Sequence, residues 1–561
     1  MSVNLTQQFL NGNLSTVDLL NKLQTLEHEY EGLQANLGIL QVNSDIFFLI
    51  TMAIVVFLMQ CGFAFLEAGS VRSKNATNIL IKNLLDSCFS CVAYWIFGWA
   101  FAFGTPSNAF IGYGQWCSHL LPDTEYHSWF FQFVFAATAS TIVSGAVAER
   151  CEFVAYAVYC SLITGFLYPV VTHWAWADGG WLKENGFVDF AGSGVVHVTG
   201  GTCAIVGAIL LGPRIGRFAK KGHPPPKEIR GHSVPFAALG GFILIFGFFA
   251  FNGGSVAKIS ELGNGASVAR SVLNTILSGS FAAFTTLIPV RIRHHKWSLL
   301  VTINGALTGM VAICASCDQV QPWSAAVIGA VAGFAYALWS AIVKLLRIDD
   351  PLDAFAVHFG GGVWGLIASP LFDINHGIVY FWNKGAFLRL GWNVLGACAI
   401  IGWSAALCVL TFGLLKVFKL LRVSEENELK GLDIVKHGEP AYPLSAYGHG
   451  WGEPWDILST TSTVADGQVK SAGNLTSEHP EMEWHLKQQV TQREGMGNVP
   501  RRKPSNFPAD PEPDQVYETY HSGMNHHAST LPHGNAYSVY PFYPGYRPLP
   551  ASAYYHGSNH Y

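Results

Sequence analysis

Long apolar segments alternate with short polar ones from residue 46 to residue 420. Most of the apolar segments are about 20 residues long, the length at which an α-helix crosses the hydrocarbon core of a bilayer. The first one follows a polar N-terminus and is too long for the apolar region of a signal peptide, so we expect it to be a membrane span. The pattern predicts eleven transmembrane helices, at 46–66, 84–104, 129–148, 153–175, 191–212, 234–253, 269–290, 298–314, 323–344, 354–372 and 391–420.

Polar regions flank this membrane domain, which we place at 45–422. Residues 423–445 are charged and polar. Residues 446–561 are rich in Pro, His, Tyr, Ser and Gly, a composition typical of a disordered tail. The histidines of the tail are irregularly spaced, which favours a plain flexible chain over a weak metal site.

The N-terminal segment 1–44 contains a regular apolar pattern within its polar sequence. Seven residues recur at alternating spacings of 4 and 3, namely Leu19, Leu23, Leu26, Tyr30, Leu33, Leu37 and Leu40. This spacing places them on one side of a helix, as in a coiled coil, and Ser15 with Asp18 resembles a capping box at its start. We expect an extracellular helix whose leucine stripe either joins copies of the chain in a three-stranded bundle or lies across its own subunit's outer surface.

Basic residues in the loops predict the orientation of the chain. Lys and Arg gather in the loops after the first, fifth and seventh spans, whereas the loop after the second has only Asp123 and Glu125 as charged residues. Since cytoplasmic loops carry the excess of Lys and Arg, the N-terminus is predicted outside and the C-terminus inside. The glycosylation sequons at Asn4 and Asn13 then face outward, while the one at Asn75 faces the cytoplasm and should stay unmodified.

Composition narrows the class of protein further. The chain of 561 residues is 50% hydrophobic and only 12% charged, about half the charged fraction of a soluble domain, so we predict a multi-pass membrane protein and not an enzyme. A net charge of -4 without a basic arm argues against a nucleic-acid partner. The two Cys-x-x-C pairs, at 88–91 and 314–317, lie far apart and lack histidines at zinc-finger spacing, so we predict neither metal nor cofactor.

An internal repeat divides the membrane domain. Segments 62–71 and 247–256 are identical at five of ten positions, and they close the first and sixth predicted spans. The repeats, at about 46–212 and 234–372 with an extra helix at 391–420, hold five spans each. An odd number of spans gives them opposite orientations in the membrane, and such inverted repeats place a substrate path between them near the bilayer midplane.

The fifth and tenth spans each contain a histidine in a similar setting. Segment 189–201 reads Asp-Phe-Ala-Gly-Ser-Gly-Val-Val-His-Val-Thr-Gly-Gly, and segment 353–362 reads Asp-Ala-Phe-Ala-Val-His-Phe-Gly-Gly-Gly. Ionisable groups inside a bilayer cost roughly 3 kcal/mol or more, which makes His197 and His358 candidates for a functional site. The alternative is two unrelated histidines that only pack between helices, and the matched contexts argue against it.

At these segments the chain resembles the Amt/Mep/Rh ammonium transporter family, and its Amt branch most. The matching stretches are 65–78, 144–150, 189–197, 251–255, 349–358 and 431–439, within a likeness that covers roughly 45–445. The resemblance implies eleven spans, a homotrimer in the plasma membrane with one pore per subunit, ammonium or ammonia as substrate, and membrane lipid around it. It also implies that His197 and His358 are the paired pore histidines.

Further roles follow from the resemblance at matching positions. Phe135 and Phe251 correspond to a stacked phenylalanine gate. Trp176, matched across a one-residue gap, and Ser255 correspond to an outer recruitment site for ammonium. Asp189 corresponds to a vestibule aspartate, although we favour an N-cap that accepts backbone N–H bonds, with an electrostatic effect on the vestibule secondary. In the 431–439 segment, plant members carry a phosphorylatable threonine where this chain has Val435, which argues against that switch here.

These residue types suit ammonium chemically. Aromatic faces attract a desolvated cation by roughly 2 kcal/mol, a phenylalanine constriction penalises intact ions, and neutral imidazoles can hydrogen-bond ammonia and pass a proton. The sequence leaves open whether ammonium moves as an ion or as neutral ammonia. It also leaves open a gas channel of the Rh type, an ammonium sensor with vestigial flux, and a proton-coupled carrier for another amine.

Overall fold

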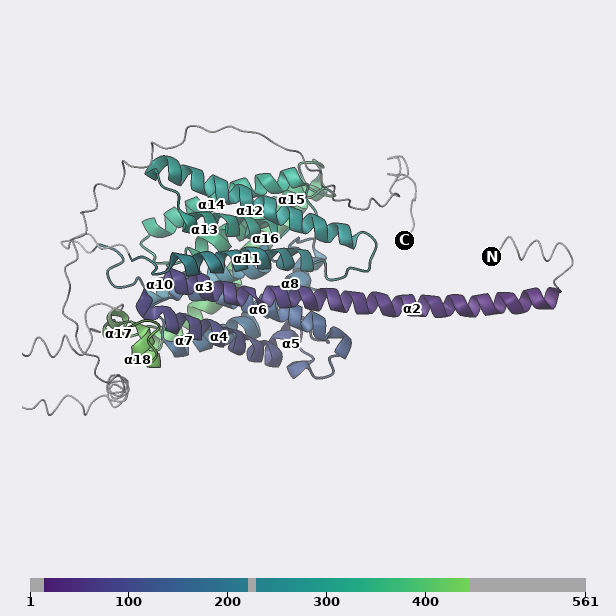
Figure 1. Cartoon of the computed structure of the whole chain (residues 1–561), viewed down its shortest axis with the longest axis horizontal. Helices are drawn as coiled ribbons and strands as arrows, with labels where there is room; N and C mark the ends of the chain where they lie inside the picture. Colours follow the sequence, from purple (N-terminus) through teal and green to yellow (C-terminus); the bar gives the residue numbers. More distant parts are fainter. Residues whose placement is uncertain (1–14, 220–228, 444–561) are drawn as a thin grey trace, which may run out of the picture. The chain divides into compact units, whose positions relative to one another are not determined.

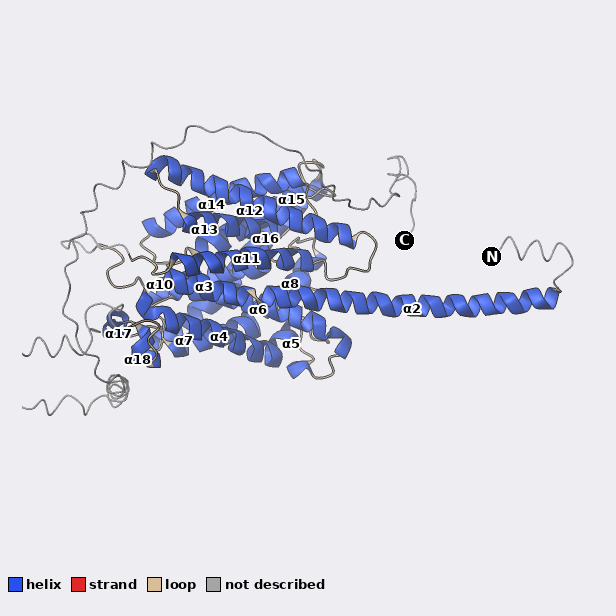
Figure 2. Cartoon of the chain, in the orientation of Figure 1, coloured by secondary structure: helices blue, strands red, loops and turns tan. Residues whose placement is uncertain are grey.

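The computed structural model describes residues 15–219 and 229–443, all within one compact unit, Met1–Lys470. Throughout these residues the regular elements are helices, accompanied by two isolated β-bridges (Figure 2). The predicted glycosylation sites Asn4 and Asn13 and the predicted tail 446–561 lie outside the described residues. The all-helical fold class is therefore confirmed for the part of the chain that is described.

The helices follow one another along the chain as labelled in Figure 1. The α-helices are α2 (Thr16–Phe57), α3 (Met59–Ser70), α4 (Ala76–Ala93), α5 (Trp99–Ala102), α6 (Tyr126–Val147), α7 (Phe153–Leu162), α8 (Tyr168–Trp176), α9 (Trp181–Glu184), α10 (Thr199–Leu211), α11 (Val234–Gly254), α12 (Asn264–His294), α13 (Leu299–Ile313), α14 (Pro322–Leu345), α15 (Gly361–Phe372), α16 (Lys384–Val417), α17 (Glu425–Lys430) and α18 (Leu432–His437). Short 3₁₀ turns are η1 (Ser73–Asn75), η3 (Trp116–Ser118) and η4 (Asp123–Glu125), and π-helical turns are η2 (Tyr94–Gly98), η5 (Ile163–Leu167), η6 (Ser193–Val198) and η7 (Phe355–Gly360).

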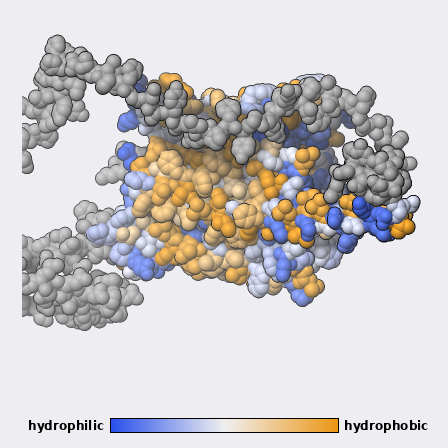
Figure 3. All heavy atoms as spheres, turned by 45° about the vertical axis from the view of Figure 1, so that its right-hand side comes forward, coloured by the Kyte–Doolittle hydropathy of each residue, from blue (hydrophilic) through white to orange (hydrophobic). Residues whose placement is uncertain are grey.

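Every predicted span has a helical segment at its position. Ten segments of the described chain are long and apolar enough to cross a membrane, and the eighth predicted span corresponds to the shorter apolar helix Leu299–Ile313. A helix satisfies all its backbone hydrogen bonds internally, which a lipid environment demands. Figure 3 shows the resulting apolar surface on one face of the helical bundle.

Local sequence signals set where several spans begin. Ser233, Ser298 and Asn383 are N-caps whose side chains accept hydrogen bonds from the backbone N–H groups three residues later. Proline occupies the first turn of α11 and α14, a position where its missing N–H costs nothing. The ends of these spans thus follow from ordinary capping chemistry.

The first helix extends far beyond its predicted start. α2 begins at Thr16 rather than near residue 46, and only a kink at Leu58 separates it from α3. The predicted capping box is confirmed, because the Asp18 N–H donates to the Ser15 side chain and the Ser15 N–H donates to the Asp18 carboxylate. The heptad segment and the first span therefore form one continuous helix, which Figure 1 shows passing beyond the bundle.

Close helix packing joins the first predicted repeat, 46–212, to the second, 234–372. α3 belongs to the first and α11 to the second, and a Cβ added at Gly240 of α11 would lie 2.5 Å from the Gly62 carbonyl oxygen and 2.7 Å from the Leu66 Cα. Only glycine permits this approach, which is how small residues let membrane helices pack backbone to backbone. The repeats are thus held side by side at their α3 and α11 helices.

The described part of the predicted segment 423–445, residues 423–443, folds back onto the bundle. The backbone N–H of Leu432 donates to Asn75 Oδ1 at 3.0 Å, and the N–H of Asn78 donates to Asp433 Oδ1 at 2.8 Å. Lys436 forms an ion pair with Glu152 at 2.9 Å. Asn75 is only 1% exposed, so the sequon at that residue is buried under this segment.

Candidate functional site

The two predicted histidines meet in the interior of the bundle. His197 lies in η6 and His358 in η7, and their Nδ1 atoms are 3.1 Å apart with the rings inclined by only 18°. Both side chains are buried, and His197 Nε2 has no hydrogen-bond partner among the described residues. Because a hydrogen bond needs one donor and one acceptor, one Nδ1 carries a proton and the other does not.

Reciprocal glycine contacts allow this approach. A Cβ at Gly201, just after η6, would lie 2.8 Å from the Phe359 Cβ in η7. A Cβ at Gly362, just after η7, would lie 2.9 Å from a methyl group of Val198 in η6. Both histidines also lie in π-helical turns, a feature often found at functional sites. The glycines after each histidine therefore serve the crossing of the two helices.

The predicted phenylalanine gate is a stacked pair next to His197. Phe135 of α6 and Phe251 of α11 have ring centroids 3.9 Å apart and planes inclined by 13°. The Phe251 centroid is 5.6 Å from that of His197. Both phenylalanines are buried, so the rings occupy the interior directly beside the histidine pair.

Trp176 and Ser255 lie on the far side of this stack from the histidines. The Trp176 ring meets Phe135 edge-on at 6.0 Å, and its indole N–H donates to the Asp189 carbonyl at 2.7 Å. The Ser255 hydroxyl donates to the Phe251 carbonyl at 2.8 Å, which leaves the oxygen lone pairs free to accept. An aromatic face and an acceptor thus flank the gate, and both residues remain partly exposed.

Asp189 accepts backbone N–H bonds at the start of η6, as favoured from the sequence, although the N-cap residue itself is Gly192. Its Oδ2 accepts from the backbone N–H groups of Gly194 at 2.9 Å and Val195 at 2.8 Å. The sequence comparison paired Asp189 with Asp353, and this pairing is wrong in structural terms. Asp350 is the counterpart, because its Oδ2 accepts from the N–H of Phe355 at 2.8 Å and it precedes its histidine by the same eight residues.

Asp353 has a different environment. Its carboxylate accepts hydrogen bonds from the Tyr336 hydroxyl at 3.0 Å and the Ser340 hydroxyl at 3.1 Å, both on α14. The eight-residue spacing from the aspartate to the histidine was the sequence signal that distinguishes Asp350 from Asp353. A match on residue type alone selected the wrong aspartate.

Two further phenylalanines of the site were missed from the sequence. Phe248 of α11 stacks on His197 at 5.7 Å, and Phe63 of α3 packs on His358 at 6.3 Å. The two residues occupy the same position of the repeated segment. The repeat itself was therefore the signal, since each copy supplies one ring to the histidine of the other half.

A buried polar cluster between α3, α4 and α6 was also missed from the sequence. Asn83 donates to Glu67 Oε2 at 2.7 Å, Ser140 donates to Asp86 Oδ1 at 3.0 Å, and Ser144 and Thr141 contact Glu67 and Asp86 respectively. Each of these last two hydroxyls also lies within 2.9 Å of a backbone carbonyl. A hydroxyl has one proton to donate, so both contacts of each hydroxyl are hydrogen bonds only if the carboxyl groups of Glu67 and Asp86 are protonated and donate.

Charged groups gather at the end of the bundle where α17 and α18 dock. Arg214 forms ion pairs with Asp349 at 2.8 Å and Glu149 at 3.2 Å, and Arg72 pairs with Glu149 at 2.8 Å. Burial acts to raise the pKa of Asp349, but hydrogen bonds and charge from Arg214 outweigh it and lower the pKa to about 2. For Glu149 burial is likewise outweighed, by Arg72 and Arg214, and its pKa is lowered.

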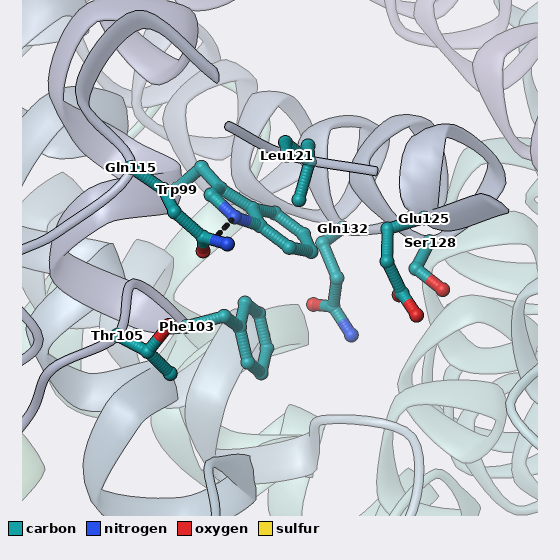
Figure 4. A pocket seen from close by; sticks show the side chains of 8 residues that line it. All are labelled: Trp99, Phe103, Thr105, Gln115, Leu121, Glu125, Ser128 and Gln132. Atoms are coloured by element: carbon teal, nitrogen blue, oxygen red, sulfur yellow. Dashed lines mark hydrogen bonds between the residues drawn. The ribbon is translucent and has the colours of Figure 1, made fainter. Parts of the chain in front are cut away.

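A separate pocket of about 370 Å³ lies between the end of α5 and the start of α6 (Figure 4). Its lining includes Trp99, whose indole N–H donates to Gln115 at 3.2 Å, and the carboxylate of Glu125. The predicted site residues are absent from its lining. The pocket is therefore distinct from the gate and the histidine pair.

Fold and site together define a multi-pass membrane protein whose buried aromatic and histidine residues form one continuous row. Comparison with known proteins gives the family. The profile of the Ammonium Transporter Family matches residues 46–442, and the chain belongs to that family. Its members are transporters and not enzymes.

Similar proteins support the same assignment. The chain is 50% identical to "Putative ammonium transporter 1" of Caenorhabditis elegans, over 81% of this chain and 89% of the relative. It is 40% identical to "Ammonium transporter 1 member 3" of Solanum lycopersicum, over 71% and 93%. Among solved structures, "Sensor Amt Protein" matches with a TM-score of 0.66 and 37% identity over 71% of this chain and 100% of that one. Saccharomyces cerevisiae Mep2 matches with a TM-score of 0.61 and 27% identity over 68% and 88%.

Proposed function

We propose that this protein is a plasma-membrane homotrimer that recruits ammonium from outside and conducts ammonia through a pore in each subunit. Trp176 and Ser255 hold the ion, the Phe135–Phe251 stack separates it from the histidines, and the ion gives its proton to solvent water at the outer end before ammonia reaches the histidines. The observation that carries the proposal is the continuous row Trp176–Phe135–Phe251–His197–His358, whose neighbouring ring centroids lie 3.9 to 6.0 Å apart.

The row is arranged to select a cation that can lose a proton. The Trp176 face attracts a cation, and Ser255 offers an acceptor to a hydrogen-bond donor, which potassium is not. The stacked phenylalanines offer an intact ion no replacement for its hydration shell, whereas neutral ammonia crosses an apolar constriction at much lower cost. His197 and His358 then hydrogen-bond ammonia, and the unpartnered His197 Nε2 is available for such a bond.

The orientation proposed is N-terminus outside, with eleven spans in two inverted repeats and one extra helix. It places Trp176 and Ser255 at the outer end of the row and the Arg214–Asp349 cluster at the cytoplasmic end. The basic loops support this orientation through the positive-inside rule. Glycosylation at Asn4 and Asn13 is proposed on the same ground.

Uptake in cells that lack their own ammonium carriers tests the proposal. We expect saturable uptake of ammonium and of labelled methylammonium, with no competition from an equal concentration of potassium. Equal competition by potassium would contradict the proposed selection. Current recording with simultaneous isotope uptake then distinguishes movement of charge from passage of neutral ammonia.

A second candidate function is ammonium sensing, favoured by the match to the structure titled "Sensor Amt Protein". A sensor would bind ammonium and show negligible flux in the same cells. Binding without uptake, at surface expression equal to that of an active relative, would favour it over transport.

A further inference from the structure

The N-terminal part of α2 has an apolar stripe that the subunit leaves uncovered. The side chains of the heptad residues are largely exposed, at 57% for Leu23, 41% for Leu26, 60% for Tyr30, 67% for Leu33 and 52% for Leu37. The alternative in which the stripe lies across its own subunit's outer surface is therefore wrong for this structure. Figure 3 shows apolar and polar side chains intermixed along this part of the helix.

A helix with such an exposed apolar stripe is energetically unfavourable in water when it has no packing partner. Most of the stability of a helix in a protein comes from the packing of its apolar face, and each exposed leucine forgoes a favourable burial. Two glycines within the stretch weaken the helix further. The ordered helix thus needs a partner that covers the stripe.

We propose that the partner is the same helix of the other two subunits, so that residues 16–43 form a parallel three-stranded coiled coil above the membrane. The inference rests on the homotrimer of the proposed function. Because α2 continues without interruption into the first span, copies inserted with one orientation must emerge parallel and in register. The number of strands comes from the trimer, since leucine at nearly every stripe position does not itself select three.

The polar residues beside the stripe agree with this register. In heptad terms Leu23, Tyr30 and Leu37 are a positions, and Leu19, Leu26, Leu33 and Leu40 are d positions. A parallel coil then sets each g residue against the e residue five positions later in the neighbouring helix. The resulting pairs are Lys22 with Glu27, Glu29 with Gln34, and Asn36 with Gln41.

Among these pairs, Lys22 and Glu27 carry opposite charges, and no pair carries like charges. A shift by one heptad would instead set Glu29 against Glu27 of the neighbouring helix, and like charges at such positions disfavour the shifted form. The glycines Gly32 and Gly38 fall at c and b positions, away from the seam, and a Cβ at either would meet no atom within 4 Å. The seam is thus free of the residues that weaken the helix.

Cysteine cross-linking on cell membranes tests the geometry. In full-length protein with the exposed Cys117 changed to serine, Leu26→Cys and Leu33→Cys place thiols at d positions. His28→Cys and Ala35→Cys, at f positions, are matched controls on the opposite side of the helix. On mild oxidation we expect disulfide-linked dimers on denaturing gels for the d variants, at least fivefold above the f variants.

Equal cross-linking at d and f positions would mean random collision and would overturn the proposal, as would none at either. A second measurement is the survival of the detergent-solubilised trimer on heating. Leu26→Asp with Leu33→Asp should lower its midpoint, whereas His28→Asp with Ala35→Asp should not. If both double variants keep the wild-type midpoint, another partner covers the stripe and the coil is wrong.

Uptake measurements separate this inference from the proposed function. Wild-type protein without ammonium uptake, but with position-specific cross-linking, would refute transport and leave the coil standing. Wild-type protein with ammonium uptake but no cross-linking would support transport and refute the coil. A monomer after gentle solubilisation, with no cross-linking at any position, would refute the trimer and the coil together.

Discussion

In the two halves of the membrane domain, the histidines have matching neighbours, whereas the residues one helical turn away differ. Phe248 packs on His197 as Phe63 packs on His358. Asp189 and Asp350 accept backbone N–H bonds in the same way, eight residues before each histidine. The shared features are those that bring two helices and two rings together, so the two halves meet at the histidines through matching contacts.

The halves diverge one helical turn away from that centre. Three residues after Phe248, the second half has Phe251, which stacks on Phe135. Three residues after Phe63, the first half has Leu66 instead. The next position is Asn252 in the second half and Glu67 in the first. Under the proposed orientation, the aromatic stack faces the side where ammonium arrives and the acidic residue faces the side of release. Matching contacts therefore form the centre around the two histidines, and the residues that differ between the halves distinguish its two sides.

Removing either histidine is the strongest test of the symmetric centre. We expect His197→Ala and His358→Ala each to lower selective ammonium uptake by roughly 100-fold, which corresponds to about 2.7 kcal/mol on the barrier. The reason is that each imidazole ring positions the other through the hydrogen bond between their Nδ1 atoms. For His358→Ala, an ion leak in place of selective uptake is an alternative outcome consistent with the site. Isotope uptake and current, normalised to surface protein, measure both.

Normal transport by both alanine variants would assign the histidines to helix packing alone. A loss in only one variant would show that the two halves are not equivalent at their centre. Correct trimer size on gel filtration is the control for folding.

Substituting the polar residue at the divergent position of each half is the next test. Asn252 donates to the Thr275 hydroxyl at 2.9 Å, and that hydroxyl itself donates to the Ser271 carbonyl. Asn252→Asp removes the donor and buries an acid, so we expect a loss of about 3 kcal/mol in stability. Glu67→Gln keeps a donor for Ser144, and we expect a loss below about 1 kcal/mol. Thermal unfolding of the purified variants provides the measurement.

Glu67→Ala is the matched control, because it removes the carboxyl partner of Asn83 and Ser144 and should cost about 2 kcal/mol. If Glu67→Gln were as damaging as Glu67→Ala, the carboxyl group would be charged in the native state. That result would contradict a protonated Glu67 carboxyl group in this cluster.

A third difference between the halves lies at the residue before each capping aspartate. Asp349 precedes Asp350 and pairs with Arg214, whereas Val188 precedes Asp189. The pKa of Asp349 is lowered from 3.8 to about 2 in the folded protein. A lowered carboxyl pKa stabilises the fold at pH values above the unfolded pKa, so this contribution, about 2 kcal/mol, is lost as the pH falls from about 4 to about 2.

Unfolding midpoints of wild type and Asp349→Asn across that pH range measure this contribution. We expect the wild-type midpoint to approach that of the variant as the pH falls. A constant gap between them down to pH 2 would show that the Asp349 charge does not contribute. Asp178→Asn, at an exposed ion pair with Lys183, is the control.

The smallest expected effect comes from making the two ends alike. Phe251→Leu gives the second half the residue of the first and removes a ring stack worth about 1 kcal/mol. We expect uptake to persist while discrimination against potassium falls roughly fivefold, measured as potassium inhibition of methylammonium uptake. Leu66→Phe is the reciprocal control and should leave discrimination unchanged. An equal change in both variants would mean that the stack has no special role.

Much of this architecture could be predicted from the sequence, because its signals are local or repeated. Span length and hydropathy predicted eleven segments, at each of which the structure has a helix, and Ser15 with Asp18 predicted the start of α2. The repeat and the family resemblance selected His197 and His358. Hydrophobic thickness, capping and backbone satisfaction act within a few residues of chain, so the sequence alone determines them.

Contacts between distant segments were decided only by the tertiary structure. The crossing of η6 and η7 sets the 3.1 Å contact between the histidines, and the packing of α3 against α11 brings Phe63 and Phe248 to them. The sequence did not predict the Glu67–Asp86 cluster, because its members lie on different helices and meet only in the fold. The continuity of α2 into the first span was also missed, since a polar stretch and an apolar one differ in composition but not in backbone geometry.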